Sequence, residues 1–124
     1  KSENIIIVLP QNDIILNCDY EKIEIVFVNL ILNAIQAMNN FGTITIRIID
    51  YQNSVKLELE DTGDGISDQV IDKIFEPLFT TRQIGTGLGL TSCKSIVEKH
   101  NGRITVETEV GKGTTFVIDL PKNL

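Results

Sequence analysis

Hydrophobic and polar residues alternate along two pairs of short segments in this chain. In residues 44–48 and 55–60 every second side chain is apolar, and a polar turn separates the two segments. Residues 104–108 and 116–120 follow a similar pattern around the glycine-containing segment 110–113. Because successive side chains of a strand point to opposite faces, these patterns predict two β-hairpins that each bury one face.

Two longer segments have the apolar spacing and the end signals of helices. Asp19 offers a side-chain oxygen that can cap the first helix, which runs to about Met38 and ends in the segment 39–42. The second helix begins near Leu88 and closes at residues 101–102, an Asn-Gly pair that is typical of a helix C-terminus.

Shorter elements complete the prediction. Residues 4–9 and 14–17 look like two short strands around a polar turn, and Ser67 can cap a short helix that runs to about Phe75. The order is two strands, a helix, two strands, a short helix, an irregular segment, a helix and two strands. This order predicts an α+β fold in which helices cover one face of a mixed sheet.

Length and composition set limits on the class of protein. With 124 residues, the chain is expected to be a single domain, 1–124. Its net charge is −6 and the acidic residues are scattered, which argues against a nucleic-acid-binding face. The distant Cys18 and Cys93 are expected to be reduced thiols of a cytosolic protein.

The sequence shows no targeting or membrane segment. No apolar run reaches the roughly 18 residues of a membrane span, and Asn29 interrupts the longest candidate. The first residues, Lys1 to Glu3, contain neither a signal peptide nor an initiator Met. We therefore expect a fragment of a longer protein.

Two amides lie four residues apart on the first predicted helix. Asn29 and Asn33 project from one face within an otherwise apolar stretch. A buried amide without partners costs about 1–3 kcal/mol, so this arrangement favours a polar ligand or a network. The oxygen of Asn33 would suit Mg²⁺, which takes few protein ligands and binds substrate phosphates. The alternative is that one amide caps a loop and the other faces water.

A glycine-containing segment, residues 61–66 with the sequence Asp-Thr-Gly-Asp-Gly-Ile, follows a predicted strand directly. Asp61 supplies an acceptor at the strand end, and an adenine amine is one donor that a fixed carboxylate could select. Gly63 and Gly65 would let the backbone turn sharply and approach a flat ligand. A plain turn between two elements is the competing interpretation.

Two further interpretations of this segment fit less well. A calcium loop aligned on residues 64–65 would need Glu at its twelfth position, where Ile71 stands. An aspartic protease also uses Asp-Thr-Gly. Those enzymes are nearly all strand, which leaves no place for the long helix predicted at residues 20–38.

A second glycine-containing segment, residues 85–90 with the sequence Gly-Thr-Gly-Leu-Gly-Leu, opens the second long helix. Free N–H groups and the helix dipole favour anions there, so we predict a phosphate site. It is not a dinucleotide fingerprint, because Leu90 stands at the last glycine position, and no Gly-Lys-Ser/Thr follows as in a P-loop. The intervening residues 75–82 are read as a movable lid with Arg82 near the phosphates, or as a surface loop anchored by two phenylalanines.

Together these segments resemble the nucleotide-binding domain of the histidine kinases, in the superfamily that also holds gyrase, the heat-shock chaperone ATPases and the mismatch-repair ATPases. Residues 29–37 resemble the family's N box, residues 61–66 its first glycine box, residues 75–81 its F box and residues 85–90 its second glycine box. All four occur in the family's order with family-like spacing. The lid region is most similar to the nitrogen-regulation and oxygen-sensing branch.

This resemblance implies the Bergerat ATP-binding fold, a two-layer α/β sandwich whose mixed, mostly antiparallel sheet is covered on one face by about three helices. It implies ATP and Mg²⁺ as ligands, with Asn33 bound to Mg²⁺, Asn29 facing the phosphates and Asp61 binding the adenine amine. We expect Asn29, Asn33 and Arg82 to act in catalysis. The implied nucleotide-binding residues are Asn29, Asn33, Asp61, Gly63, Gly65, Ile66, Phe79, Thr80, Thr81, Arg82, Gly85, Thr86, Gly87, Leu88, Gly89 and Leu90.

Two departures from the superfamily pattern bear on mechanism. Water-activating members carry a Glu four residues before the metal-binding Asn, where this chain has Asn29. A neutral amide cannot take a proton from water, which favours a kinase, with the anti-sigma-factor serine kinases as a related alternative. Arg82 stands where Lys is more usual, which keeps the charge and changes its reach.

The single histidine, His100, falls at the predicted C-terminus of the second helix, where a positive imidazole would be mildly favourable. We interpret it as structural. The resemblance then implies a phosphate-accepting histidine on a separate dimerisation domain of the full-length protein, and a response regulator downstream. The competing hypothesis is a nucleotide-binding or docking module without transfer activity.

The chain itself is expected to be cytoplasmic. It is also expected to be a monomer, because its helices show no sustained heptad seam. We expect it to contact neither nucleic acid nor the membrane, even if the full-length protein is membrane-anchored.

Overall fold

The computed structural model describes residues 4–11, 18–39, 41–76 and 87–122. The elements are β1 (Asn4–Val8), α1 (Tyr20–Met38), β2 (Phe41–Asp50), β3 (Ser54–Asp61), α2 (Asp68–Ile71), α3 (Gly87–Lys99), β4 (Arg103–Glu109) and β5 (Gly113–Pro121). The predicted strand at 14–17 and the predicted lid at 77–82 lie outside the described residues.

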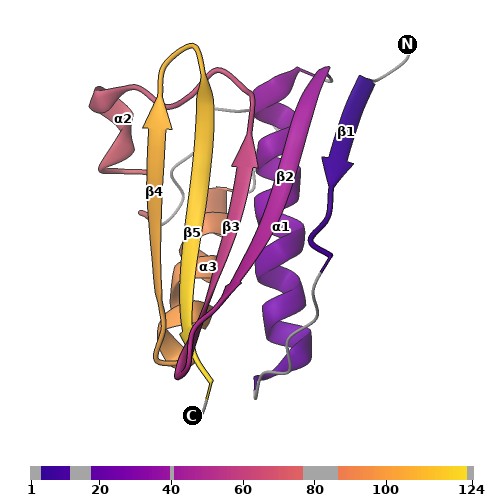
Figure 1. Ribbon diagram of the computed structural model, residues 1–124. Helices are drawn as coiled ribbons and strands as arrows, with labels where there is room; N and C mark the ends of the chain where they lie inside the picture. Colours follow the sequence, from indigo (N-terminus) through magenta and orange to yellow (C-terminus); the bar gives the residue numbers. More distant parts are fainter. Residues whose placement is uncertain (1–3, 12–17, 40, 77–86, 123–124) are drawn as a thin grey trace.

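The sheet has five described strands in the order β1-β2-β3-β5-β4. Strands β1 and β2 run parallel, and the other neighbours run antiparallel. Helices α1 and α3 lie side by side against one face of this sheet, as Figure 1 shows. The predicted α+β fold, a mixed and mostly antiparallel sheet with its helices on one face, is therefore confirmed.

Helix α1 begins and ends where the sequence signals predicted. The Asp19 side chain accepts a hydrogen bond from the backbone N–H of Lys22 at 3.2 Å, and Asn39 closes the helix in the left-handed conformation with φ of 54°. The helix buries one stripe, formed by Val26, Leu30, Ala34 and Met38. These residues recur every four positions, so they lie on one face of the helix and pack against the sheet.

The two predicted hairpins are present and supply the rest of the core. In β3, Val55, Leu57, Leu59 and Asp61 all point inward, and the residues between them are more exposed. In β5, Phe116 pairs with Val106 of β4, and Ile118 pairs with Ile104. Thr108 pairs with Thr114, and Leu120 lies beyond the end of β4 and pairs with Val55 of β3.

The short helix is shorter than the sequence predicted. Helix α2 ends at Ile71, whereas the prediction extended it to about Phe75. The following residues form turns, which bring Ile74 into the core with 5% of its surface exposed. The Phe75 ring meets the Phe116 ring edge-on, with centroids 6.3 Å apart. Burial of these two side chains decides the local path of the chain, and helix propensity does not.

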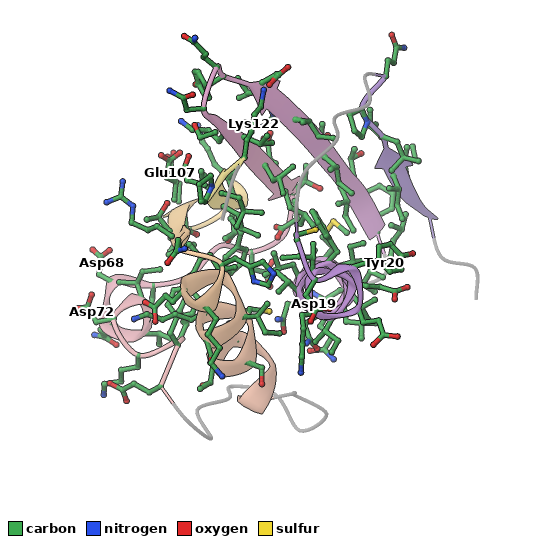
Figure 2. All side chains as sticks on the ribbon, turned by 90° about the horizontal axis from the view of Figure 1, so that it is seen from below. Asp19, Tyr20, Asp68, Asp72, Glu107 and Lys122 are labelled. Atoms are coloured by element: carbon green, nitrogen blue, oxygen red, sulfur yellow. The ribbon has the colours of Figure 1, made fainter. Side chains whose placement is uncertain are left out.

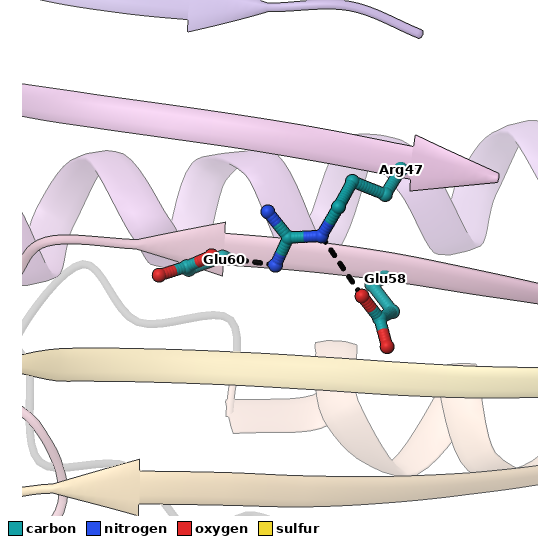
Figure 3. A network of polar contacts seen from close by, with 3 residues as sticks. All are labelled: Arg47, Glu58 and Glu60. Atoms are coloured by element: carbon teal, nitrogen blue, oxygen red, sulfur yellow. Dashed lines mark hydrogen bonds and ion pairs between the residues drawn. The ribbon is translucent and has the colours of Figure 1, made fainter.

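The face of the sheet opposite the helices carries polar side chains. Arg47 of β2 donates to Glu58 of β3 at 2.9 Å and also to Glu60, as Figure 3 shows. These side chains are partly exposed, and ion pairs of this kind contribute little to stability. The apolar core and any site built into it therefore lie on the helix-covered face. Among the residues that the structure describes, no helix is long and apolar enough to cross a membrane.

Candidate nucleotide-binding site

Asp61 ends strand β3 on the inward face, where only 4% of its surface is exposed. Its carboxylate accepts a hydrogen bond from the backbone N–H of Gly63 at 2.8 Å and another from the backbone of Thr114. Burial raises the pKa of Asp61 above its ordinary value, and these two hydrogen bonds oppose the rise. The site thus holds a desolvated carboxylate with acceptor capacity left over for a ligand.

The loop after Asp61 is fastened to protein on two sides. On one side, the Asp64 N–H donates to the carbonyl oxygen of Ala37, in the last turn of α1, at 3.3 Å. On the other side, the Asp64 carbonyl oxygen accepts from Gly111 at 2.8 Å, and the Ile66 N–H donates to the Thr108 hydroxyl at 2.8 Å. The loop therefore bridges α1 and the β4–β5 hairpin.

The glycines of this loop are required by the protein itself. A Cβ on Gly63 would lie 2.8 Å from the carbonyl oxygen of Ala37, and a Cβ on Gly65 would run into the backbone of Glu109. Gly65 also has a φ of 80°, a conformation that side chains disfavour. The sequence interpretation that they allow approach to a ligand is thus incomplete, because the close approach in this structure is to neighbouring backbone.

Asn29 and Asn33 lie on α1 at intermediate exposure. The amide nitrogen of Asn33 is buried and has no hydrogen-bond partner within the part of the chain that the structure describes. Leaving such a group unsatisfied costs about 1–3 kcal/mol, so an incoming ligand that satisfies the amide removes this cost. Asn29 lies beside the buried thiol of Cys93, whose pKa burial raises to about 12 despite the hydrogen bond from Asn29. Cys93 is therefore an inert packing residue.

The first turn of α3 contains Gly87, Leu88 and Gly89 and has no acidic residue, so its free N–H groups can attract an anion. Helices α1 and α3 run antiparallel. The start of α1 lies beside the end of α3, where the backbone of Asp19 contacts His100. Further along both helices, the Cys93 thiol of α3 lies 3.7 Å from the Val26 carbonyl oxygen of α1. Gly87 precedes Cys93 by six residues, or about 9 Å of helix, which places the first turn of α3 level with Asn29 and Asn33.

The structure therefore brings Asp61, its glycine loop, the two asparagines and the start of α3 to one end of the helix-covered face. Ile66 and Leu90 are partly buried and pack against the core beside them. The remaining predicted site residues lie outside the described part of the chain: Phe79, Thr80, Thr81, Arg82, Gly85 and Thr86. Their roles stay predictions.

Sequence reasoning did not include Thr108 and Thr114 in the site. Both line a cavity of about 260 Å³ that also reaches Asp61. Their positions on the inward-facing register of β4 and β5 were the available signal, because Thr114 pairs directly with Asp61 and with Thr108. The lining of this cavity also includes the charged residues Glu60, Glu107, Glu109 and Lys112. Glu60 belongs to the face of the sheet opposite the helices, so the cavity is not confined to the helix-covered face.

The donor set can be tested against Mg²⁺. Within the described ranges no three acidic, histidine or cysteine side chains gather into a metal site. Mg²⁺ bound to a nucleotide needs few protein ligands, because phosphate oxygens and water supply the others. Asn33 could offer its amide oxygen to such a cation, while its buried amide nitrogen, which has no partner among the described residues, would donate to a neighbouring acceptor such as a phosphate oxygen.

The ring of His100 contacts backbone groups at the start of α1 and near the end of α3. The imidazole is buried, its Nε2 accepts from the backbone N–H of Asp19 at 3.0 Å, and its Nδ1 lies 2.8 Å from the Ile96 carbonyl oxygen. One nitrogen must accept while the other donates, so the ring is the neutral Nδ1–H form. Figure 2 looks along α1 from its first turn and labels Asp19 at this junction.

Comparison with known proteins agrees with this geometry. Residues 18–124 match the family model described as histidine kinase-, DNA gyrase B- and HSP90-like ATPase. The chain is 41% identical over 112 residues to sporulation kinase A of Bacillus subtilis. This alignment covers 90% of this chain and 18% of the kinase. It is 42% identical over 109 residues to the sensor histidine kinase ZraS of Escherichia coli, covering 88% of this chain and 23% of ZraS.

Among solved structures, the catalytic domain of the histidine kinase ThkA superimposes with a TM-score of 0.86 at 35% identity, covering 97% of this chain and 80% of that one. Another structure shows ThkA in complex with the response regulator protein TrrA, at 32% identity and a TM-score of 0.79, covering 95% of this chain and 34% of that chain. This chain spans about a fifth of the length of sporulation kinase A and of ZraS.

Proposed function

This chain belongs to the family of histidine kinase-, DNA gyrase B- and HSP90-like ATPases, and from that premise we propose that it binds ATP with Mg²⁺ and positions the γ-phosphate for transfer to a histidine on another domain. The observation that carries this proposal is the buried Asp61 carboxylate, which accepts from the backbone N–H of Gly63 in a loop anchored to the last turn of α1. In the proposal, Asp61 is the base-selective acceptor and the first turn of α3 is the anion site.

Each end of the nucleotide has a matching partner in the proposal. Asp61 accepts from the exocyclic amine of adenine, while the N–H groups at the start of α3 face the phosphates. The amide oxygen of Asn33 would hold Mg²⁺, which would neutralise charge on the phosphates when bound. Arg82 and the lid residues complete the predicted set.

Asn29 decides between transfer and hydrolysis. It occupies the position from which a Glu would activate water in the hydrolysing members of this superfamily, and its amide cannot accept a proton from water. We therefore propose a phosphotransferase in which the protein contributes positioning and charge stabilisation. An anti-sigma-factor-like serine kinase is the alternative of the same superfamily.

The partners follow from the relatives. Sporulation kinase A and ZraS are named kinases, and ThkA has been seen with a response regulator. We propose that a dimerisation domain of the same full-length protein supplies the accepting histidine, and that a response regulator receives the phosphate from it. A docking module that binds nucleotide without transfer is the competing hypothesis.

The test is the thermal unfolding midpoint with and without a non-hydrolysable ATP analogue and Mg²⁺. At about 100 times its dissociation constant, a ligand of the native state adds about 2.7 kcal/mol, which is a rise of several degrees for a domain of this size. Asp61→Asn should abolish most of this rise, because one acceptor oxygen is replaced by an amino group. Asp64→Asn is the matched control, since Asp64 is exposed and contacts its neighbours through its backbone. No rise with millimolar nucleotide would reject the proposal.

A further inference from the structure

The hydroxyl group of Thr108 is fully used by three contacts. Its oxygen accepts from the Ile66 N–H at 2.8 Å, it donates to the Gly113 carbonyl oxygen at 3.0 Å, and it lies 2.9 Å from the hydroxyl of Thr114. A threonine hydroxyl has one proton and two lone pairs. These three partners therefore account for its entire hydrogen-bonding capacity.

This saturation fixes the direction of the bond between the two threonines. The Gly113 carbonyl oxygen can only accept and the Ile66 N–H can only donate, so the one proton of Thr108 goes to Gly113. The remaining contact needs a proton from Thr114. The Thr114 hydroxyl therefore points its proton at Thr108, and its lone pairs are available on the other side.

Thr114 stands between Thr108 and Asp61. It pairs directly with Asp61 on β3 and with Thr108 on β4, so the three residues form a row across the sheet on the helix-covered face. Thr114 and Asp61 are both buried, with 5% and 4% of their surfaces exposed. A carboxylate can only accept hydrogen bonds. Two neighbouring groups in this row thus present acceptors and no donor.

We propose that Thr108 is a positioning residue that sets base specificity, by holding Thr114 as an acceptor beside Asp61. This inference rests on the proposed nucleotide-binding function. Adenine satisfies two acceptors, because its exocyclic amine carries two N–H groups. Hypoxanthine has a carbonyl oxygen at the same place and would put a third acceptor against the other two.

Removal of the Thr108 hydroxyl releases the proton of Thr114. The freed hydroxyl can then turn toward Asp61 or toward a carbonyl oxygen of the ligand, so the row offers a donor as well as an acceptor. Discrimination against hypoxanthine falls for this reason. A loss of loop anchoring alone would weaken both nucleotides to the same extent, since the anchored loop does not distinguish the two bases.

The experiment measures, by titration calorimetry, the affinities of the chain for a non-hydrolysable ATP analogue and for its inosine counterpart, each with Mg²⁺. The variants are Thr108→Val, which is close in shape, and Thr108→Ser, which keeps the hydroxyl. We expect the unaltered chain and Thr108→Ser to prefer the adenine nucleotide by about tenfold or more, the worth of one unsatisfied buried group. Thr108→Val should reduce this preference severalfold, and Asp61 accounts for the preference that remains.

The outcomes separate this inference from the function on which it rests. If the unaltered chain binds neither nucleotide, the nucleotide-binding proposal fails and this inference fails with it. If it binds adenine preferentially and Thr108→Val keeps the same preference, only the role of Thr108 is overturned. An equal loss of preference in Thr108→Ser would also overturn it. Should Thr108→Val fail to fold, Thr108→Ala removes the hydroxyl without placing a methyl group in its position next to Gly113, and the same ratio of affinities decides.

Discussion

At the scale of single residues, Asp61, the proposed acceptor for adenine, is buried at a cost to stability. The carboxylate is buried at the end of β3, and burial raises its pKa above the ordinary value of 3.8. As pH rises, the unfolded chain therefore loses this proton before the folded chain does. The folded state binds more protons in the interval between the two pKa values, so stability falls as pH rises through that interval.

The raised pKa of Asp61 leads to a prediction about the stability of a variant. Without nucleotide and near neutral pH, Asp61→Asn should raise the free energy of unfolding, because an amide resembles the protonated carboxyl group that the folded state prefers. The difference should vanish below pH 3.8, where the carboxyl group is protonated in both states. Urea unfolding at the two pH values measures it. The exposed Asp64→Asn is the control, and a larger loss of stability in Asp61→Asn than in this control would contradict the argument.

At the scale of elements, the two long helices are tied at one end by His100. The imidazole accepts a hydrogen bond from the backbone N–H of Asp19, just before α1, and its other nitrogen lies close to the carbonyl oxygen of Ile96 within α3. The contact with Asp19 satisfies a backbone N–H that has no intrahelical partner, and the Ile96 carbonyl oxygen also accepts from the backbone N–H of His100 at 3.2 Å. The start of α1 and the end of α3 therefore form one joint, far from the glycine loop.

We expect His100→Ala to lower the free energy of unfolding by about 1–3 kcal/mol, because it leaves a buried backbone donor unsatisfied. Urea unfolding at neutral pH gives the change. Glu98→Ala, an exposed substitution two residues earlier on the same helix, should change stability by less than about 0.5 kcal/mol. Equal effects of the two substitutions on the free energy of unfolding would show that the His100 contacts do not contribute to stability.

The elements also show what the sequence could and could not predict. The ends of α1 and α3 were predictable because capping residues such as Asp19 and Asn101 act locally. The hairpins were predictable because alternation repeats over many residues. The end of α2 at Ile71 was not, because burial of Ile74 is a tertiary effect.

The candidate site also contains residues that the sequence could predict and residues that it could not. Asp61 and Asn33 stand in recognisable segments, so the sequence alone was enough to propose them as site residues. The role of Thr108 depends on which strand becomes the neighbour of β5, and the packing of Gly63 depends on Ala37 of another element. Such relations arise between segments far apart in the chain, and no local pattern encodes them.

At the scale of the whole molecule, the only histidine lies at the opposite end of the helix pair from the proposed phosphate site. His100 is buried and both ring nitrogens are engaged, so it presents no free nucleophile. The proposed γ-phosphate would lie near the first turn of α3, and His100 follows the last residue of that helix. Transfer must therefore use an acceptor from elsewhere.

We accordingly expect no acid-labile phosphate on this chain after incubation with radiolabelled ATP and Mg²⁺. Label should appear on the histidine-bearing domain of the full-length protein when that domain is added. His100→Ala should leave this transfer intact once the folded fraction is matched. Label on the chain alone that His100→Ala abolishes would refute the assignment, and nucleotide binding without any transfer would favour the docking-module alternative.

The doubly fastened loop after Asp61 has a consequence for how the molecule folds. Each hairpin joins strands that are close in sequence, whereas the central β3–β5 pairing joins residues as far apart as Ser54 and Pro121. Pairing over such separations is slow, because the entropy of a large loop must be lost first. The loop is anchored to α1 and to the β4–β5 hairpin, so it can take its final shape only after that late step. A folding intermediate that holds the two hairpins but has not joined them would have no pocket for a base, and ligand affinity should recover together with the slowest refolding phase.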